Sequence, residues 1–449
     1  FLEYGEYFTE KEKKLVVEAC RIHDLGKVNL VFQAMICPKL AEKFYIDVRK
    51  TQQIPHGFLS AVTISLDEFD DLSELFSDKD FGPFITAVYY HHDREDHYNS
   101  PAIRKYAEKY YMKQIEEYLN RKIRKLNCSN LDDLLFRNNV YTGKYIPDSN
   151  AWKEYLLIKG LLNKFDYTVS AGYENAESAI DLHEKKLVKN IEKFLNGKEL
   201  RPAQKFMKMN RDKNLIVIAP TGSGKTEASL LWMNGEKSFY TLPLKVSSNA
   251  IYLRIKENYE YKDVALLHSD AMAVYLREYN GNEDIGEKYE RSKMLSQPLG
   301  TEIFAATLKY SKLVLDEIQA YEPRVIATII YGLKMIQEMG GKFAIITATF
   351  PPVLKYFMEQ YGLVEGKQYI FKDFTGKEYQ VEKYPRHKVE IRHSEMNLDE
   401  IRLRGKNRKV LVICNTVSKA QKLYKKLEGE NVWLLHSKYI RRDRAFLER

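Results

Sequence analysis

The first 170 residues contain an ordered set of histidines and aspartates that could hold metal ions. Adjacent His23 and Asp24 begin the set, and its remaining members are His56, His91, His92 and Asp166. A carboxylate beside an imidazole can bridge two divalent cations while other imidazoles complete their coordination, and such a pair of cations can cleave a phosphoester. A lone histidine is more often a core or surface residue, but the ordered set predicts a two-metal phosphoester hydrolase.

A glycine-rich loop at residues 219–226 forms a second candidate site, between a predicted strand and a predicted helix. Its glycines let the backbone curl so that N–H groups point at phosphate oxygens. Lys225 can reach the β- and γ-phosphates, and the Thr226 hydroxyl can ligate Mg²⁺. We therefore expect ATP with Mg²⁺ at this loop. The candidate nucleotide-binding residues are Thr221, Gly222, Ser223, Gly224, Lys225 and Thr226.

Two acidic residues, Asp316 and Glu317, follow the apolar run 313–315. A site that hydrolyses a nucleotide needs one carboxylate to hold the metal-bound water and another to act on the attacking water. Asp316 would bind Mg²⁺ through its water shell, and Glu317 would orient or deprotonate the attacking water. A strand that ends in two acids is commonplace by itself, but together with the glycine-rich loop it indicates a nucleotide hydrolase.

The elements that must position these sites differ between the two parts of the chain. Up to about residue 195, apolar residues recur at helical spacing and predict an all-α domain over 1–195. From about residue 200, short β-branched runs alternate with helical stretches, which predicts a parallel sheet covered by helices over 196–380. A polar break then precedes a second α/β unit, over 381–449, that is only begun. The predicted strands are 215–219, 239–242, 264–267, 313–315, 344–347, 410–414 and 432–435.

Composition narrows the classes of protein. Lys and Arg number 71 against 62 Asp and Glu, and this formal charge of +9 is a weak indication of nucleic-acid binding. No apolar run reaches the length of a membrane span, and four separated cysteines without a CxxC pair favour a reducing cytoplasm. The helix predicted at 102–125 is basic and tyrosine-rich. A solvated helix with inward tyrosines is the favoured interpretation, and a nucleic-acid track is the alternative.

Several motifs of the second part resemble those of superfamily-2 helicases. Residues 316–319 (DEIQ) resemble the DExH/D-box, and 347–349 (TAT) resemble the motif that couples hydrolysis to strand movement. The resemblance implies RecA-like domains and an ATP-driven translocase in which Gln204 reads adenine. Residues 415–416 resemble the first motif of a second motor domain. The residues implied to contact a DNA or RNA backbone are Thr241, Pro243, Ser247 and Asn249.

The first part resembles the HD phosphohydrolase superfamily, and its segments HDLGK, HGFLSA and NKFDYTVSA resemble the nuclease domain of one helicase family. The resemblance implies that Lys27 is a catalytic residue near the scissile phosphate, beside Asp24, and that Ser170 supports Asp166. One or two ions of Mn, Fe, Co, Ni or Zn suit such imidazole-rich ligation better than Mg. The implied metal ligands are His23, Asp24, His56, His91, His92 and Asp166.

The order of the two parts resembles the nuclease–helicases of type I CRISPR systems. That resemblance implies a single-stranded DNA translocase and nuclease that degrades target DNA in antiviral defence. It also implies recruitment by an RNA-guided surveillance complex, 3′ to 5′ movement, a monomer, no membrane, and a prokaryotic cytoplasmic location. One alternative is an HD enzyme that acts on nucleotides, with a regulatory helicase-like domain. Another is an inactive DNA-binding scaffold, although a scaffold would need neither Lys225 nor Asp316 and Glu317.

Several motifs of the family have no clear counterpart in these 449 residues, including one expected to contact DNA between residues 299 and 316. None of the 22 residues before His23 is the earlier histidine ligand, and nothing after His436 matches the later motor motifs or their arginine finger. We therefore expect a longer natural protein. Because an arginine finger contributes about 10³–10⁵ in rate, we also expect this chain to bind ATP yet hydrolyse it slowly.

Overall fold

The computed structural model describes residues 4–64, 81–92, 101–123, 126, 150–177, 185–269, 271, 301–379, 389–394, 396–427, 429 and 431–439. Contacts divide the chain into two compact units, Phe1–Val381 and Glu382–Arg449. Within the described ranges, no helix combines the length and the apolar character that crossing a membrane requires.

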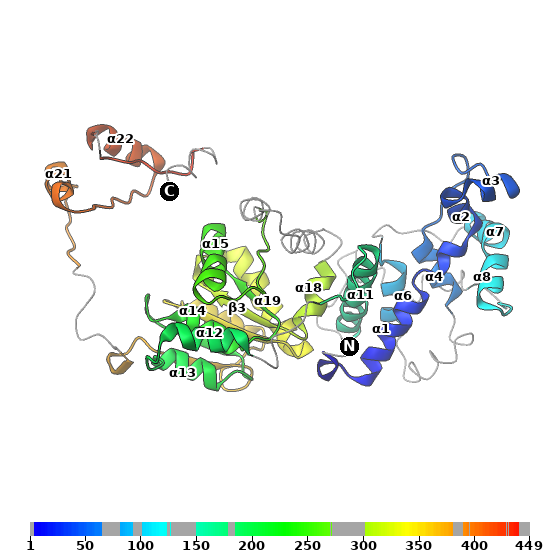
Figure 1. Cartoon of the computed structure of the whole chain (residues 1–449), viewed down its shortest axis with the longest axis horizontal. Helices are drawn as coiled ribbons and strands as arrows, with labels where there is room; N and C mark the ends of the chain where they lie inside the picture. The colour runs from blue at the N-terminus through cyan, green and yellow to red at the C-terminus, as the bar shows by residue number, and fades with distance from the viewer. Residues whose placement is uncertain are drawn as a thin grey trace. The chain divides into compact units, whose positions relative to one another are not determined.

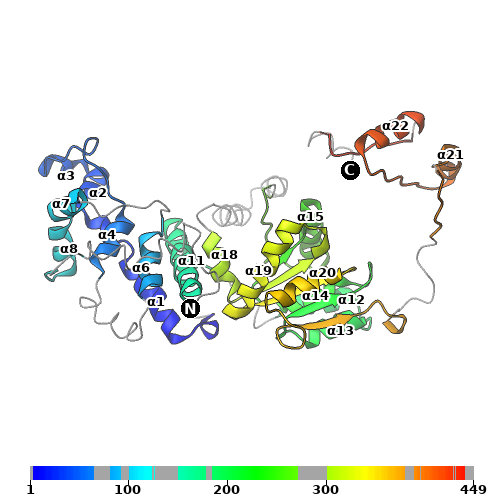
Figure 2. The same ribbon diagram turned by 180° about the vertical axis from the view of Figure 1, so that it is seen from behind.

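The N-terminal part of the first unit is helical (Figure 1). Its α-helices are α1 (Glu10–Ile22), α2 (Leu30–Ile36), α3 (Pro38–Lys43), α4 (His56–Thr63), α6 (Gly82–Tyr89), α7 (Pro101–Tyr110), α8 (Met112–Leu119) and α11 (Asn150–Ser170). Two short 3₁₀ helices, η1 (Gly5–Tyr7) and η2 (Leu25–Val28), flank α1. Both views show α1, α6 and α11 side by side, in agreement with their mutual contacts (Figure 2).

Local sequence explains why α1 begins and which face it buries. The Thr9 hydroxyl accepts a hydrogen bond from the backbone N–H of Glu12, and the Glu12 carboxylate accepts one from the backbone N–H of Thr9. Such a capping box satisfies two backbone donors at the helix start. Leu15, Ala19 and Ile22 recur at helical spacing and are buried in the core that also encloses α4 and α6. The end of α1, which carries His23, is therefore fixed against that core.

The tyrosines of the basic segment 102–125, which spans most of α7 and the whole of α8, are divided between core and surface. Tyr106 and Tyr111 are buried, whereas Tyr118 is exposed. The Tyr111 hydroxyl lies 2.5 Å from the Thr63 hydroxyl, and that of Tyr106 donates to Asn29 at 3.1 Å. Tyr106 and Tyr111 therefore pack into the core of the helical part, as the interpretation with inward tyrosines expects.

The rest of the first unit is an α/β domain with one five-stranded parallel sheet. Its strands are β1 (Leu215–Ile218), β2 (Ser238–Thr241), β3 (Lys312–Asp316), β4 (Lys342–Thr347) and β5 (Ile370–Asp373), in the spatial order β2-β3-β4-β1-β5. Its helices are α12 (Lys186–Leu195), α13 (Pro202–Met209), α14 (Lys225–Met233), α15 (Lys245–Leu253), α18 (Thr301–Leu308), α19 (Pro323–Met339) and α20 (Pro352–Gln360), with the π-helix η3 (Arg254–Asn258) and the 3₁₀ helices η5 (Ile318–Ala320) and η6 (Lys377–Tyr379).

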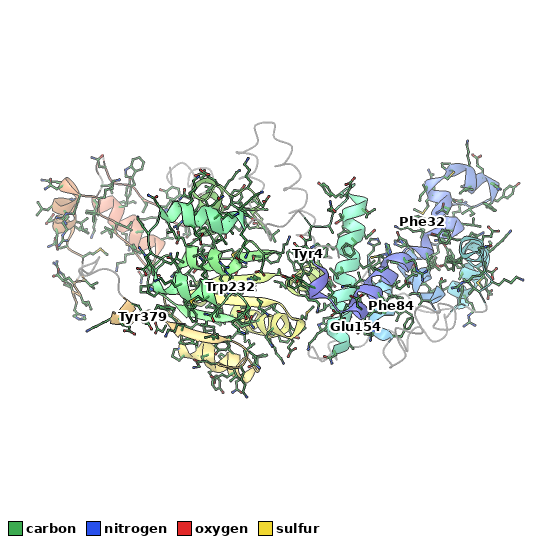
Figure 3. All side chains as sticks on the ribbon, turned by 60° about the horizontal axis from the view of Figure 1, so that its bottom comes forward. Tyr4, Phe32, Phe84, Glu154, Trp232 and Tyr379 are labelled. Carbon is green, nitrogen blue, oxygen red and sulfur yellow. The ribbon has the colours of Figure 1, made fainter. Side chains whose placement is uncertain are left out.

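Helices cover both faces of this sheet, so its strands are apolar on both sides. In β1, Val217 packs into the core that includes α13 and α14, and neighbouring Ile216 packs into the core that includes α19 and α20. Trp232, on α14, is fully buried on the first face (Figure 3). In open parallel sheets, ligands bind beyond the carboxyl ends of the strands. The loops after β1 and β3 lie at that edge of the sheet.

Three predicted strands are wrong. Residues 264–267, 410–414 and 432–435 have no strand pairing in the part of the chain that the structure describes. Leu411 and Ile413 are largely exposed, so their apolar run has no described strand beside it. An apolar run becomes a strand only where another strand meets its backbone groups. Conversely, the edge strand β5 was not predicted.

The second unit contains α21 (Leu398–Asn407) and α22 (Val417–Leu427). Asn397 caps α21, because its side chain accepts hydrogen bonds from the N–H groups of Asp399 and Glu400. The Thr416 hydroxyl accepts a hydrogen bond from the N–H of Lys419 in the first turn of α22. The predicted motif at 415–416 thus lies at the start of a helix.

Helix α11 approaches α18 closely at Gly160. A Cβ atom there would lie 2.3 Å from the Glu302 carbonyl oxygen, so only glycine permits this approach. Beside it, buried Lys159 donates to Glu302 at 3.1 Å. One turn further along α11, Lys164 donates to the Tyr310 hydroxyl at 2.7 Å. Because α18 leads into β3, these contacts join the helix that carries Asp166 to the strand that ends at Asp316.

Glu177 is the centre of the charged contacts between these two parts. It forms ion pairs with Lys164 and Lys237 and accepts a hydrogen bond from Tyr310 at 2.7 Å. Burial alone would raise the pKa of Glu177, but the two ammonium groups outweigh burial and lower the pKa to about 2. The folded protein therefore binds a proton at Glu177 less readily than the unfolded chain does.

Replacing Glu177 with glutamine is expected to destabilise the protein at neutral pH. A carboxyl whose pKa falls on folding contributes stability above its unfolded pKa, near 4.5, and loses it as the pH falls toward 2. The difference in unfolding free energy between wild type and Glu177→Gln should be about 3 kcal/mol at pH 7 and shrink between pH 5 and pH 3. Urea unfolding over that range measures it, with Glu199→Gln, in an exposed pair, as control. A difference independent of pH would contradict the assignment.

Candidate metal centre and nucleotide site

The turn that carries His23 and Asp24 is held against the start of α4. Ser60, on α4, donates its hydroxyl to the His23 carbonyl at 2.6 Å and accepts from the Gly26 N–H at 2.8 Å. A Cβ atom on Gly26 would lie 2.1 Å from the His56 carbonyl oxygen, so a side chain at this position would force the two segments apart. The glycine and the buried hydroxyl together place His56 beside Asp24.

The structure brings all six predicted metal ligands together. His56 begins α4, His91 and His92 follow α6, and Asp166 lies on α11. Within the described residues, potential ligand atoms no more than 4.8 Å apart form two groups that share Asp24. The first group is Asp24, His56, His91 and His92, and the second is His23, Asp24 and Asp166.

The short distances in this cluster join imidazoles to carboxylates and also to each other, because His56 Nε2 lies 3.1 Å from His91 Nε2. His23 Nε2 and His56 Nε2 each lie 3.4 Å from one Asp24 oxygen, Oδ2 and Oδ1 respectively. His92 Nε2 lies 3.4 Å from Asp166 Oδ2. The two Asp24 oxygens therefore face different histidines, which is the arrangement that a bridging carboxylate needs.

Two backbone carbonyls fix the orientation of the buried imidazoles. His23 Nδ1 lies 2.8 Å from the Cys20 carbonyl oxygen, and His91 Nδ1 lies 2.6 Å from that of Val88. A ring that donates through Nδ1 presents its Nε2 lone pair, and both Nε2 atoms face the cluster. His23 Nε2 and Asp24 Oδ1 are buried without a hydrogen-bond partner in the part of the chain described. Cations held by the two ligand groups would satisfy both atoms, so the residues present fit a metal.

The pKa values of three of these four histidines favour the neutral form that a metal ligand requires. Burial lowers the pKa of His56 to about 4, and it lowers the pKa values of His91 and His92 as well. Burial would also lower the pKa of His23, but the Asp166 and Asp24 carboxylates outweigh it and raise that pKa. Burial opposes ionisation of Asp166, yet His23 and His92 hold its pKa below the usual range.

Lys27 and Ser170 are the other two residues expected near this centre, and only Lys27 lies at it. Lys27 donates to Asp24 Oδ2 at 2.7 Å, so its positive charge lies at the centre. Ser170 does not support Asp166: it is exposed at the last residue of α11, and no hydrogen bond joins the two in the described structure. Ser170 follows Asp166 by four positions, and its side chain remains on the solvent side. Asn163, which sequence reasoning missed, is instead buried with both amide atoms unpaired in the described chain.

The nucleotide site begins directly after β1. Gly222 and Gly224 adopt left-handed backbone conformations, with φ of +77° and +83°, so that the loop turns sharply before α14 begins at Lys225. Lys225 donates to Glu317 Oε1 at 2.6 Å. The predicted loop lysine and the predicted acid therefore contact each other across 92 residues of sequence.

Gln204 and Thr347 connect this loop to its surroundings. Gln204, buried on α13, donates its amide to the Gly224 carbonyl at 3.3 Å and accepts from the Arg201 N–H at 3.0 Å. The Thr347 hydroxyl donates to Gln319 at 2.6 Å and lies 3.3 Å from Glu317. The motif at the end of β4 is thus hydrogen-bonded to the acidic motif after β3.

The two acids have pKa values shifted in opposite directions. Burial raises the pKa of Asp316, although a hydrogen bond from Tyr240 opposes it. Burial would raise that of Glu317 too, but Lys225 and Gln319 outweigh it and lower the pKa. Glu317 is therefore ionised wherever Lys225 stays beside it. Tyr240 is a second residue that sequence reasoning missed, because a tyrosine in an apolar strand carries no motif.

The residues expected to contact nucleic acid lie at and after the end of β2. The Thr241 hydroxyl donates to the Val314 carbonyl at 2.8 Å and is thus part of the sheet. Asn249, on α15, lies 2.8 Å from His268. Pro243 and Ser247, between them, are partly exposed.

Comparison with known proteins assigns each of the two parts that carry these sites to a known kind of domain. A family model described as "Cas3, HD domain" matches residues 6–150, and the model of the DEAD/DEAH box helicases matches residues 202–357. A third model, for the C-terminal part of the CRISPR-associated nuclease/helicase Cas3, matches residues 406–449. The chain is thus an HD domain joined to a DEAD/DEAH-box helicase domain. It belongs to the family of CRISPR-associated nuclease/helicases called Cas3.

Two curated relatives extend this match. The CRISPR-associated nuclease/helicase Cas3 of Methanothermobacter thermautotrophicus is 25% identical over 516 residues, which cover 97% of this chain and 61% of the relative. A protein of Methanocaldococcus jannaschii is 24% identical over 282 residues, which cover 54% of this chain and 38% of the relative. The chain therefore spans less than two thirds of each.

Solved structures agree with the fold. The crystal structure of T. fusca Cas3 matches with a TM-score of 0.52 and 15% identity, covering 79% of this chain and 46% of the other. A crystal structure of a CRISPR-associated protein matches with a TM-score of 0.53 and 15% identity, covering 100% of this chain and 61% of the other. The predicted fold class is confirmed: a multidomain chain in which an all-α HD-type domain precedes an α/β helicase domain with a parallel sheet.

Proposed function

We propose that the protein cuts single-stranded DNA at its metal centre and moves along it by ATP hydrolysis, as the nuclease–helicase of type I CRISPR interference. One observation carries the proposal. A chain of this family places six metal-ligating side chains in two groups around Asp24 and also pairs Lys225 with Glu317 beside a phosphate-binding loop. The name of the Methanothermobacter relative, a CRISPR-associated nuclease/helicase, supports the same activity.

The metal centre would hold one or two divalent ions, drawn from Mn, Fe, Co, Ni and Zn, because imidazole is the main ligand type. A bound ion of this kind supplies a Lewis acid and lowers the pKa of its water. Asp24 would bridge the two positions, and the carbonyls of Cys20 and Val88 would keep His23 and His91 in the tautomer that binds. Lys27 adds a positive charge beside Asp24, where it can attract a DNA phosphate.

The nucleotide site would bind ATP with Mg²⁺. Backbone N–H groups of the loop at 219–224 and the Lys225 ammonium would hold the phosphates, and Thr226 and Asp316 would hold the metal and its water shell. Glu317 would orient the attacking water once ATP has drawn Lys225 away from it. Gln204 would read adenine from α13, and Pro243, Ser247 and Asn249 would contact the DNA backbone.

We propose that these sites belong to separate domains: a nuclease domain over 1–195, a first RecA-like domain over 196–380, and the beginning of a second over 381–449. The division between compact units after Val381 supports the last boundary. We further propose that the protein acts as a monomer and receives its DNA from an RNA-guided surveillance complex. Asp24 in both ligand groups favours this nuclease over an inactive scaffold, which would have no use for a built metal centre.

A nuclease assay tests the proposal against the rival nucleotide hydrolase. Purified protein is incubated with single-stranded DNA and each of Mn, Fe, Co, Ni, Zn and Mg, with and without ATP, and in parallel with free and cyclic nucleotides. We expect metal-dependent cutting of DNA that needs no ATP, because the two sites have separate ligands. Hydrolysis of the small nucleotides alone would support the rival function.

A further inference from the structure

Tyr240 makes a contact that no motif predicts. It lies on β2, and its hydroxyl donates to Asp316 Oδ2 at 2.8 Å. In the parallel register, Tyr240 pairs with Val314, two residues before Asp316. Side chains two apart on a strand point to the same face, so the sheet itself sets the phenol against the carboxylate. The hydrogen bond from Thr241 to the Val314 carbonyl, at 2.8 Å, further fixes this register.

The two carboxylate oxygens of Asp316 differ in their hydrogen bonding. Asp316 is only 6% exposed. Its Oδ2 accepts from Tyr240, whereas Oδ1 is buried and has no hydrogen-bond partner among the described residues. A buried carboxylate oxygen without a partner is costly unless a ligand satisfies it. Oδ1 is thus the atom available to a cation or to its water shell.

Tyr240 is suited to hold Oδ2 permanently. Its hydroxyl also lies within hydrogen-bonding reach of the Thr226 and Ser229 hydroxyls on α14. The phenol donates toward the carboxylate, because an ionised carboxylate can only accept a hydrogen bond. The same hydroxyl thus interacts with both residues expected to hold Mg²⁺, Asp316 and Thr226.

We propose that Tyr240 is a positioning residue for Mg²⁺ at the nucleotide site: its hydroxyl restrains Oδ2 of Asp316 so that Oδ1 is directed at the metal's water shell. The inference rests on the proposed binding of ATP with Mg²⁺ at the loop after β1. Residues that orient a metal-binding group through a hydrogen bond typically contribute about 10- to 100-fold in metal affinity. Losing the Tyr240 hydroxyl should therefore weaken Mg²⁺ binding without removing the nucleotide pocket.

The test is the Mg²⁺ dependence of nucleotide binding in Tyr240→Phe. A fluorescent ATP analogue is titrated into the protein at a series of Mg²⁺ concentrations and in excess EDTA. We expect the half-saturating Mg²⁺ concentration to rise about 10- to 100-fold in the variant. Affinity for the analogue in EDTA should match that of the wild type, and saturating Mg²⁺ should restore full affinity. A variant that had only lost packing would fail in EDTA as well.

Tyr259→Phe provides the matched control. Tyr259 is also buried, and its hydroxyl donates to a carboxylate on α14, that of Glu227, at 2.6 Å. It should show the wild-type dependence on Mg²⁺. An unchanged half-saturating concentration in Tyr240→Phe, or an equal shift in both variants, would overturn the inference and leave the proposed function standing. If the wild type bound the analogue identically with and without Mg²⁺, both the inference and the assignment of Mg²⁺ to this site would be wrong.

Discussion

Replacing Asp24 with alanine is expected to abolish metal-dependent cutting of single-stranded DNA and to leave ATP binding intact. Asp24 is the one member common to both ligand groups found in the described structure, with its two oxygens facing different histidines. Its loss removes a ligand from both metal positions at once. Residues that merely orient a ligand contribute about 10- to 100-fold, so the loss of a shared ligand should exceed 100-fold in cutting rate.

Metal content provides a readout that does not depend on cutting. When both metal positions are filled, wild type should bind two ions. Asp24→Ala should bind none. His92→Ala removes a ligand from the first group only, and Asp166→Asn from the second only, so each should retain one ion. Asp47→Asn, at an exposed carboxylate of the same helical part, serves as the control. If Asp24→Ala still cut DNA at the wild-type rate, the metal-site assignment would be wrong.

Sequence alone could predict which residues come together at these two candidate sites, because their residue types are chemically specific. An ordered set of histidines and aspartates, followed by a glycine-rich loop with a lysine, is an unusual combination. It can be recognised in the sequence without knowledge of the fold. The strands that carry the nucleotide site, β1 and β3, were predicted for a similar reason: they are apolar runs next to the motifs. Their neighbours in the sheet determine whether such runs pair, which explains why 264–267 and 410–414 were wrongly predicted.

The contacts that hold the sites in place could not be predicted, because they join residues far apart in sequence and of common types. Ser60 bonds the turn at His23 from 37 residues away, and Tyr240 reaches Asp316 across 76 residues. Lys159 shows that burial, too, can depend on a partner far away in the sequence. A lysine in a helix is expected on the surface, yet Lys159 is 1% exposed because Glu302 is paired with it. Local periodicity contains no information about such a partner.

The pair formed by Lys225 and Glu317 leads to the second prediction, in which two substitutions act in opposite directions. Lys225→Ala should weaken ATP binding about 10- to 100-fold, because the ammonium group would no longer bond the phosphates and such charged hydrogen bonds contribute about 1.5–3 kcal/mol. Glu317→Gln should bind ATP at least as tightly as wild type, because ATP no longer competes with a carboxylate for Lys225. Its turnover should fall about 10²–10⁴-fold, the typical contribution of a general base.

Equilibrium binding of ATP and its turnover with single-stranded DNA measure these effects. Lys208→Ala, which breaks an exposed pair between α13 and Glu192 of α12, should behave as wild type. Equal weakening of ATP binding in Lys225→Ala and Glu317→Gln would mean that their contact is structural and that neither acts on ATP as proposed. Lys225→Ala should also keep metal-dependent cutting, just as Asp24→Ala keeps ATP binding. Because the ligands of the two sites lie in different parts of the fold, joined through α11 and α18, either site can be removed while the other persists.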